Sequence, residues 1–210
     1  MKLPVKVCGV NDAAFAVRAA ELGVGWLGFI FADGSPRRVS PEKAREIAAA
    51  VRAAVAAPPR FVGVFVRGDS AEIAATAAFA GLDVVQLHGD FGADGIASLK
   101  AKGFEVWRLA SAGAVPPAGE DAVLLDGRDG ARTGGTGRLA DWSLVVALKR
   151  DGRRVVLAGG ISAENVAAAA ATGADILDVN SSIETSPGSK SCALLETLVS
   201  ALRKKGWPTR

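Results

Sequence analysis

The sequence predicts a closed barrel of eight parallel strands with helices on its outside, a (β/α)₈ barrel. Short apolar runs rich in β-branched and aromatic residues recur along the 210 residues, and alanine-rich stretches with spaced charges lie between most of them. Strands that are apolar on both faces and alternate with helices pair in parallel. A doubly wound open sheet is the alternative that these observations leave open.

Eight segments have the composition of a buried strand. Each is short, and most of their residues are apolar. In chain order they are residues 5–8, 26–31, 61–66, 84–88, 104–109, 122–126, 154–160 and 175–179.

Helix signals are clearest in four stretches, residues 11–23, 40–56, 69–81 and 162–173. They begin at Asn, Ser or Asp, which cap helix N-termini, and three of them end at glycine. Between the fifth and sixth strands the segment 110–121 is short and contains Pro116-Pro117, so we expect the fifth helix to be missing or vestigial. Because no linker or break in composition is present, we expect a single domain over residues 1–210.

Charge and composition restrict the partners. The net charge is +3, and the basic residues form no stripe interleaved with aromatic residues, which argues against nucleic acid. A mild positive bias favours a small anionic substrate. The N-terminus lacks the apolar core of a signal peptide and no apolar run is long enough to span a bilayer, so we expect a cytoplasmic protein without a membrane partner.

The two cysteines, Cys8 and Cys192, lie far apart and outside any CxxC or Cys/His cluster. Neither a disulfide framework nor a structural zinc site is indicated. We expect both to be free thiols.

Polar residues at the ends of the predicted strands are the candidates for catalysis, since in such barrels the active site lies at the carboxyl ends of the strands. These residues are Cys8 with Gly9, Gln86, His88, Asp126, Gly159, Gly160 and Asp178, the last followed by "NSSIE".

Each of these residues also has a purely structural interpretation. Cys8 could fill the core as a small apolar residue, and His88 could be a structural side chain. Asp126 could cap a turn, but it closes an apolar run just before the glycine-rich loop "GRDGARTGGTG", which favours a functional role. Within that loop, the segment "TGGTGR", from Thr133, is interpreted as a flap over the site.

Small residues follow the seventh and eighth strands. Gly159, Gly160, Ser181 and Ser182 allow backbone N–H groups to approach a phosphate, which many barrels bind between these two loops. Ordinary turn glycines and helix caps are the alternative interpretation.

Taken together, the motifs resemble those of the phosphoribosylanthranilate isomerases, which are phosphate-binding (β/α)₈ barrels. The resemblance covers almost the whole chain. It rests on the ordered series "KVCGV", "GFIF" with "SPRRV", "VGVFV", "VQLHG", "LLD" with "GGTG" and "DW", "LAGGISAENV", and "DVNSSIE" with "SPGSK".

The resemblance implies an Amadori rearrangement of N-(5-phosphoribosyl)anthranilate in tryptophan biosynthesis, without metal or cofactor. It implies that Asp126 is the general acid that protonates the ring oxygen and that Cys8 is the general base at C2. Arg37 and Asp178 would hold the anthranilate, and the phosphate would rest on the loops of Gly159, Gly160, Ser181 and Ser182. Lys6 and His88 complete the expected substrate-binding set.

The residue types suit this chemistry. Ring opening requires an acid that carries a proton, and a thiol with an ordinary pKa of about 8.5 accepts a proton once a cation such as Lys6 stabilises the thiolate. This chain has Asn180-Ser181-Ser182 where the family often has Ser-Ser-Gly, so the details of phosphate binding stay open. Another sugar-phosphate barrel enzyme, of the epimerase or thiamin-phosphate synthase type, and a catalytically silent sugar-phosphate binding barrel are the alternative functions. A monomer and a homodimer are both compatible with the sequence.

Overall fold

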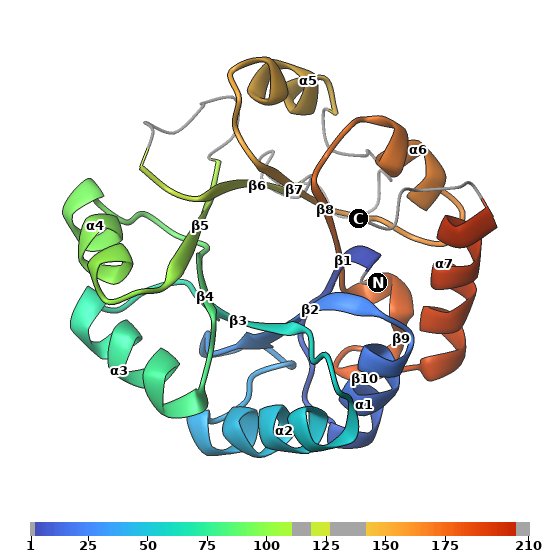
Figure 1. Ribbon diagram of the computed structural model, residues 1–210, viewed down its shortest axis with the longest axis horizontal. Coiled ribbons are helices and arrows are strands. Elements are labelled where there is room, and N and C mark those ends of the chain that lie inside the picture. The colour runs from blue at the N-terminus through green and yellow to red at the C-terminus, as the bar shows by residue number, and fades with distance from the viewer. Residues whose placement is uncertain (1–2, 111–118, 127–141, 205–210) are drawn as a thin grey trace.

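The computed structural model describes residues 3–110, 119–126 and 142–204. Eight strands in these ranges form a closed barrel in which each strand pairs in parallel with the next and β8 pairs with β1 (Figure 1). The predicted barrel is confirmed, and the open sheet is excluded. The strands are β1 Leu3–Val7, β2 Val24–Ile30, β3 Arg60–Phe65, β4 Val84–Leu87, β5 Glu105–Leu109, β6 Ala122–Asp126, β7 Val155–Ala158 and β8 Ile176–Val179.

Helices surround the barrel, as Figure 1 shows. They are α1 Ala13–Glu21, α2 Pro41–Ala54, α3 Ser70–Ala80, α4 Ala93–Ala101, α5 Ser143–Arg150, α6 Val166–Ala171 and α7 Cys192–Lys204. Between β5 and β6 the described residues, Ala110 and 119–121, form no helix, which is compatible with the predicted missing helix. Residues 111–118 of this connection lie outside the described ranges, as does the predicted flap at residues 133–138.

Local sequence explains where several helices begin. Asp12 accepts a hydrogen bond from the Phe15 N–H at 2.7 Å and caps α1, and Asp69 accepts from the first turn of α3. Ser40 caps α2, whose first residue is Pro41, a residue that needs no hydrogen-bond partner for its nitrogen. These caps fix where the chain leaves each strand and enters the next helix.

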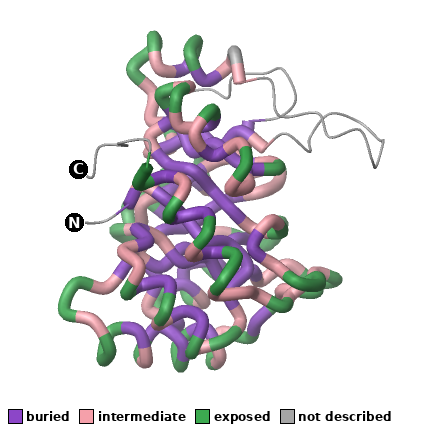
Figure 2. The backbone as a smooth tube through the Cα atoms, turned by 90° about the vertical axis from the view of Figure 1, so that its right-hand side faces the viewer, coloured by how far each residue is buried: buried purple, intermediate pink, exposed green. Residues whose placement is uncertain are grey.

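The barrel places alternate strand residues inside. Outward-facing apolar residues pack against the helices in the main core, while a second cluster that includes Val62, Val84, Trp107 and Val156 fills the interior. Figure 2 shows that the barrel is largely buried and that exposure is concentrated on the outer helices and loops.

Charged and aromatic groups close the amino-terminal end of the barrel. Glu105 accepts hydrogen bonds from Arg60, from Arg154 at 2.7 Å and from the Trp107 indole. The rings of Trp26 and Trp107 lie 6.1 Å apart, and the Arg154 guanidinium lies 5.7 Å from the Trp26 ring. The interior is therefore filled at this end, and the opposite end is the open one.

A short insertion follows β8. A 3₁₀ turn, η1 Ser181–Ile183, leads into a two-stranded hairpin of β9 Glu184–Ser186 and β10 Ser189–Lys190. The hairpin turn is held against the loops after β1 and β2, because Asn11 donates a hydrogen bond to the Gly188 carbonyl at 3.0 Å and a Cβ at Gly188 would meet the Pro36 carbonyl oxygen at 2.7 Å.

Candidate active site

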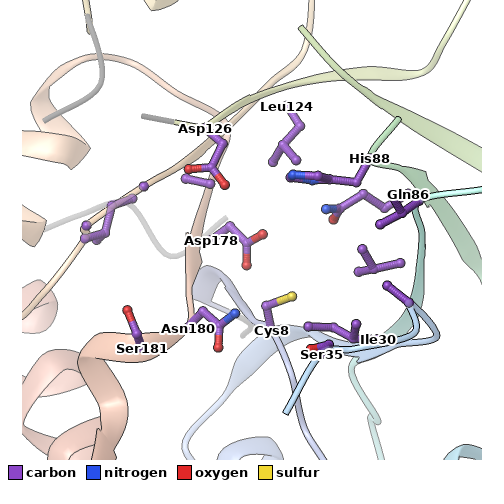
Figure 3. A pocket seen from close by; sticks show the side chains of 17 residues that line it. Cys8, Ile30, Ser35, Gln86, His88, Leu124, Asp126, Asp178, Asn180 and Ser181 are labelled. Atoms are coloured by element: carbon purple, nitrogen blue, oxygen red, sulfur yellow. The ribbon is translucent and has the colours of Figure 1, made fainter. Parts of the chain in front are cut away.

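A pocket with a volume of about 330 Å³ opens at the carboxyl ends of the barrel strands (Figure 3). Seven of the eight strands, all but β5, contribute to it with their own residues or with the residues that follow them. The lining residues are Cys8, Ile30, Ala32, Ser35, Val64, Val66, Gln86, His88, Leu124, Asp126, Ala158, Gly159, Gly160, Ile161, Asp178, Asn180 and Ser181.

The two proposed proton carriers enter this pocket from different sides. Figure 3 shows the Asp126 carboxylate and the Cys8 thiol pointing into the pocket, with the Asp178 carboxylate between them. The period of two in a strand explains the placement, since Asp126 is two residues after the interior residue Leu124. Cys8 likewise comes two residues after the interior Lys6.

Lys6 and Asp178 form a buried ion pair across the seam between β1 and β8. The two residues are register partners, and the Lys6 Nζ lies 2.6 Å from the Asp178 Oδ2. Lys6 is fully buried and does not line the pocket. Gly28 makes room for it, because a Cβ at that position would lie 3.0 Å from the Lys6 Cε.

Burial and charge act against each other at this pair. Burial alone would lower the pKa of Lys6, but the charges and hydrogen bonds of Asp178 and Cys8 together raise it. Burial raises the pKa of the Asp178 carboxyl and that of the Cys8 thiol, and the Lys6 ammonium opposes both shifts. Lys6 is thus the nearby cation expected to favour the thiolate, although burial has the larger effect on Cys8.

Arg37 binds a carboxylate of the protein itself. Its Nε and Nη2 donate to the two oxygens of Glu184 at 2.8 and 2.6 Å, in a bidentate arrangement. Lys190 adds an ion pair to Glu184 at 2.8 Å and donates to the Asn180 Oδ1 at 2.7 Å. Burial would raise the pKa of Glu184, but the hydrogen bonds from Arg37 and Lys190 lower it to about 2.

Gly9 holds a position that a larger residue would disturb. Its φ is +71°, and a Cβ there would lie 2.6 Å from the Arg37 Cδ. The glycine after Cys8 therefore lets the backbone turn away from the strand directly against the Arg37 side chain.

The predicted phosphate loops lie together at the pocket. Gly159 and Gly160 have φ values of +90° and +71° and line it together with Ser181. Asn165 braces the first loop by accepting from the Ser162 N–H at 2.8 Å and donating to the Gly160 carbonyl at 2.9 Å. Ser182 lies in the 3₁₀ turn, a conformation open to any residue, so it has no need of the glycine that is common at this place in the family.

The structure brings most of the predicted site residues to one pocket. Those on its lining are Cys8, His88, Asp126, Gly159, Gly160, Asp178 and Ser181. Lys6 lies beneath the pocket, Arg37 lies beside it on Glu184, and Ser182 is not on the lining; its hydroxyl is buried without a partner in the described part of the chain.

Of Gln86, Asn180, Glu184 and Lys190, which all lie in this region, only Gln86 was a strand-end candidate from the sequence. The other three occur within the motifs "DVNSSIE" and "SPGSK", but only the fold shows that Glu184 and Lys190 meet Arg37.

Residues 3–110, 119–126 and 142–204 contain neither a metal centre nor a membrane-spanning helix. No group of three or more His, Cys, Asp and Glu side chains is arranged to hold a metal ion. No helix in these ranges has the length and apolar character needed to cross a membrane.

Comparison with known proteins agrees with this geometry. A family model described as N-(5'phosphoribosyl)anthranilate (PRA) isomerase matches residues 5–201. An N-(5'-phosphoribosyl)anthranilate isomerase from Granulibacter bethesdensis is 37% identical over 212 residues, which covers 97% of this chain and 99% of that protein.

Solved structures show the same similarity. A phosphoribosyl anthranilate isomerase from Thermus thermophilus is 32% identical with a TM-score of 0.82, covering 97% of this chain and 99% of that one. Another, in complex with reduced 1-(o-carboxyphenylamino)-1-deoxyribulose 5-phosphate, is 26% identical with a TM-score of 0.79, covering 97% and 100%. Monomers generated from a dimeric isomerase of Thermotoga maritima are 28% identical with a TM-score of 0.77, covering 97% and 99%. Because the family model spans nearly the whole chain and the relative from Granulibacter aligns over almost its full length, the chain belongs to the N-(5'-phosphoribosyl)anthranilate isomerase family.

Proposed function

We propose that the pocket at the barrel mouth performs the family's reaction with Asp126 as general acid and Cys8 as general base. Membership of the family makes the chain an isomerase of tryptophan biosynthesis that converts N-(5'-phosphoribosyl)anthranilate by an Amadori rearrangement, an intramolecular aldose–ketose conversion. The observation that carries the assignment of roles is that an acid and a thiol enter one pocket from different sides, beside two loops suited to phosphate.

The two proton transfers follow from the chemistry of the substrate. Asp126 donates a proton to the ring oxygen, the C1–O bond breaks, and the nitrogen lone pair forms a protonated imine at C1. The Cys8 thiolate then removes the proton from C2, which gives an enol that becomes the 2-ketone. General acid and base catalysis of this kind contributes about 10²- to 10⁴-fold each.

The remaining residues bind and orient the substrate in this proposal. Backbone groups of Gly159, Gly160, Ser181 and Ser182 hold the phosphate. Asp178 and His88 face the substrate.

Lys6 and Arg37 act from the edge of the site. Lys6 keeps Asp178 in place and supplies the positive charge nearest to Cys8. Arg37 binds the anthranilate carboxylate with the donors that Glu184 does not use.

Domain extent, assembly and location are also proposals. We expect residues 1–210 to behave as one domain, active in the cytoplasm as a monomer or a homodimer. The dimeric relative from Thermotoga maritima supports testing for a dimer first. Sedimentation of the purified protein decides between the two states.

A turnover assay tests the function. The purified chain, made in a host without its own isomerase, is given N-(5'-phosphoribosyl)anthranilate, and the 1-deoxyribulose 5-phosphate product is quantified. We expect turnover that is lost in Cys8→Ala and in Asp126→Ala. Binding of the substrate without turnover would instead indicate a silent sugar-phosphate binding barrel.

A further inference from the structure

Gln86 is a buried polar side chain of the pocket whose oxygen is unpaired among the residues that the structure describes. It lies on β4, only 2% of its surface is exposed, and it lines the pocket. Its Oε1 atom is buried without a hydrogen-bond partner anywhere in the described part of the chain. Figure 3 shows its amide pointing into the pocket beside His88.

An unpaired buried amide is unfavourable in the free protein. Burying such a group without a hydrogen bond costs free energy that an apolar side chain of similar size would not cost. Its register partners on the adjacent strands are Val64, which is apolar, and Trp107, whose indole N–H is already donated to Glu105. The amide is therefore suited to a ligand that enters the pocket.

The position of Gln86 indicates which end of a ligand it meets. In the closed order of eight strands, β4 stands opposite β8, and the predicted phosphate loops follow β7 and β8. A substrate whose phosphate lies at those loops extends its other end toward β4. Ile30, Val64 and Leu124 form an apolar wall on the pocket close to this side.

The chemistry of an amide further indicates which groups of the ligand Gln86 binds. Gln86 offers both an acceptor and donors and carries no charge at any working pH. The aminobenzoate end of the substrate presents an N–H donor and, on the neighbouring ring carbon, a carboxylate acceptor. Because Arg37 already gives two of its nitrogens to Glu184, the carboxylate that its remaining donors would bind can accept a second donor.

We propose that Gln86 determines specificity for the aminobenzoate end of the substrate, with its oxygen accepting from the amine N–H and its nitrogen donating to the carboxylate. This inference rests on the proposed function of the pocket. A substrate lacking the carboxylate would lose one of the two contacts, whereas the phosphate would be held as before.

Binding of two probes to Gln86→Met tests the proposal. The probes are the reduced product analogue, 1-(o-carboxyphenylamino)-1-deoxyribitol 5-phosphate, and inorganic phosphate, both measured by calorimetry. We expect Gln86→Met to weaken binding of the analogue by about 10- to 100-fold and to leave binding of phosphate unchanged. The substitution should also raise the melting temperature of the free protein. Leu87→Met, on the same strand but buried in the outer core, is the matched control and should leave analogue binding unchanged.

The specificity arm uses an analogue without the carboxylate, an N-phenyl sugar phosphate. In Gln86→Met the penalty for removing the carboxylate should be smaller than in the wild-type protein. Normal analogue binding by Gln86→Met would overturn the role of Gln86, and so would equal weakening of analogue and phosphate. If the wild-type protein turns the substrate over and Gln86→Met binds the analogue normally, this inference alone is refuted. If the wild-type protein does not bind the analogue, the proposed function is refuted as well.

Discussion

At the scale of single residues, the buried Lys6 ammonium connects two groups of the pocket. Lys6 contacts Asp178 directly and lies near Cys8, so it influences the protonation of both groups. A carboxylate and a thiol placed side by side would otherwise disfavour each other's ionised forms. In the mechanism that we propose, Lys6 offsets part of the effect of burial on the Cys8 thiolate and holds the adjacent carboxylate in place.

Removing either proposed proton carrier should slow the chemical step selectively. We expect Cys8→Ala and Asp126→Asn each to lower kcat by about 10²-fold or more, with substrate affinity within about tenfold of wild type. Cys8→Ser should resemble Cys8→Ala, because a hydroxyl is a much poorer base at neutral pH. Steady-state kinetics on variants shown to be folded by circular dichroism provide the measurement, and near-normal kcat in Cys8→Ala would return this thiol to a core-filling role.

The reactivity of the Cys8 thiol should follow its raised pKa. Because burial raises the pKa of Cys8, its alkylation rate should keep rising with pH beyond the ordinary thiol value of about 8.5. The experiment follows iodoacetamide modification by mass spectrometry in a Cys192→Ser background, and an excess of the product analogue should protect the thiol. A midpoint at or below pH 8 would contradict the assigned direction.

At the scale of elements, the hairpin after β8 is tied to the barrel mouth by charge. Glu184 at the start of β9 receives Arg37 from the loop after β2 and Lys190 from β10. The Glu184 and Lys190 side chains are only 3% and 1% exposed. These contacts link two loops that both border the pocket, so they stabilise its rim.

Acid should weaken this link. The pKa of Glu184 is lowered to about 2 in the folded protein, well below the usual value for a glutamate of about 4.3, so its contribution to stability is present above the higher value and is lost as the pH falls toward the lower one. Glu184→Gln should cost about 1–3 kcal/mol at pH 7 and a shrinking amount between pH 5 and 2. Urea unfolding of the wild type and of Glu184→Gln across this pH range gives the difference in their free energies of unfolding.

Glu196→Gln is the matched control for that experiment. Glu196 also pairs with an arginine, Arg18, but both side chains are more than two-fifths exposed. An exposed pair contributes little, so we expect a change of less than about 1 kcal/mol. Equal effects of the two substitutions would show that the Glu184 network does not stabilise the rim.

The sequence predicted the elements and the strand-end residues better than it predicted their partners. Asp126, Cys8 and Gly159 follow apolar strand runs, and a closed parallel barrel necessarily brings such ends to one face. The bond between Arg37 and Glu184 joins residues 147 positions apart, and its geometry depends on the turns of the hairpin, which carry no periodic signal. For the same reason Lys6 could be predicted near the thiol but not as the buried partner of Asp178.

At the scale of the whole molecule, the Lys6–Asp178 pair lies where the barrel closes. It joins the first strand to the last, with side chains that are 0% and 7% exposed. A buried charge left without its partner is strongly destabilising, whereas loss of both charges is tolerated far better. Once one charged member of the pair is present, the closed barrel therefore needs the other to remain stable.

A double-mutant cycle measures this dependence. Lys6→Met alone should cost about 3–5 kcal/mol, because it leaves the Asp178 carboxyl buried and uncompensated. Lys6→Met combined with Asp178→Asn should recover at least about half of that loss, although both variants should be poorly active. Urea unfolding of the wild type, the two single variants and the double variant gives the coupling free energy between Lys6 and Asp178. Strictly additive losses of stability would show that the ion pair is not the cause of the destabilisation.

The tryptophan pair at the filled end of the barrel provides an optical signal of the core. Two indoles 6.1 Å apart, tilted by 58° and held against each other at this end of the barrel, should couple their electronic transitions and give a near-ultraviolet circular dichroism band. Trp26 and Trp107 are not among the residues that line the pocket, so the band should change little when a ligand binds and disappear when the barrel loses its packing. Each of the variants above can therefore be checked spectroscopically for an intact interior, independently of whether its mouth is occupied.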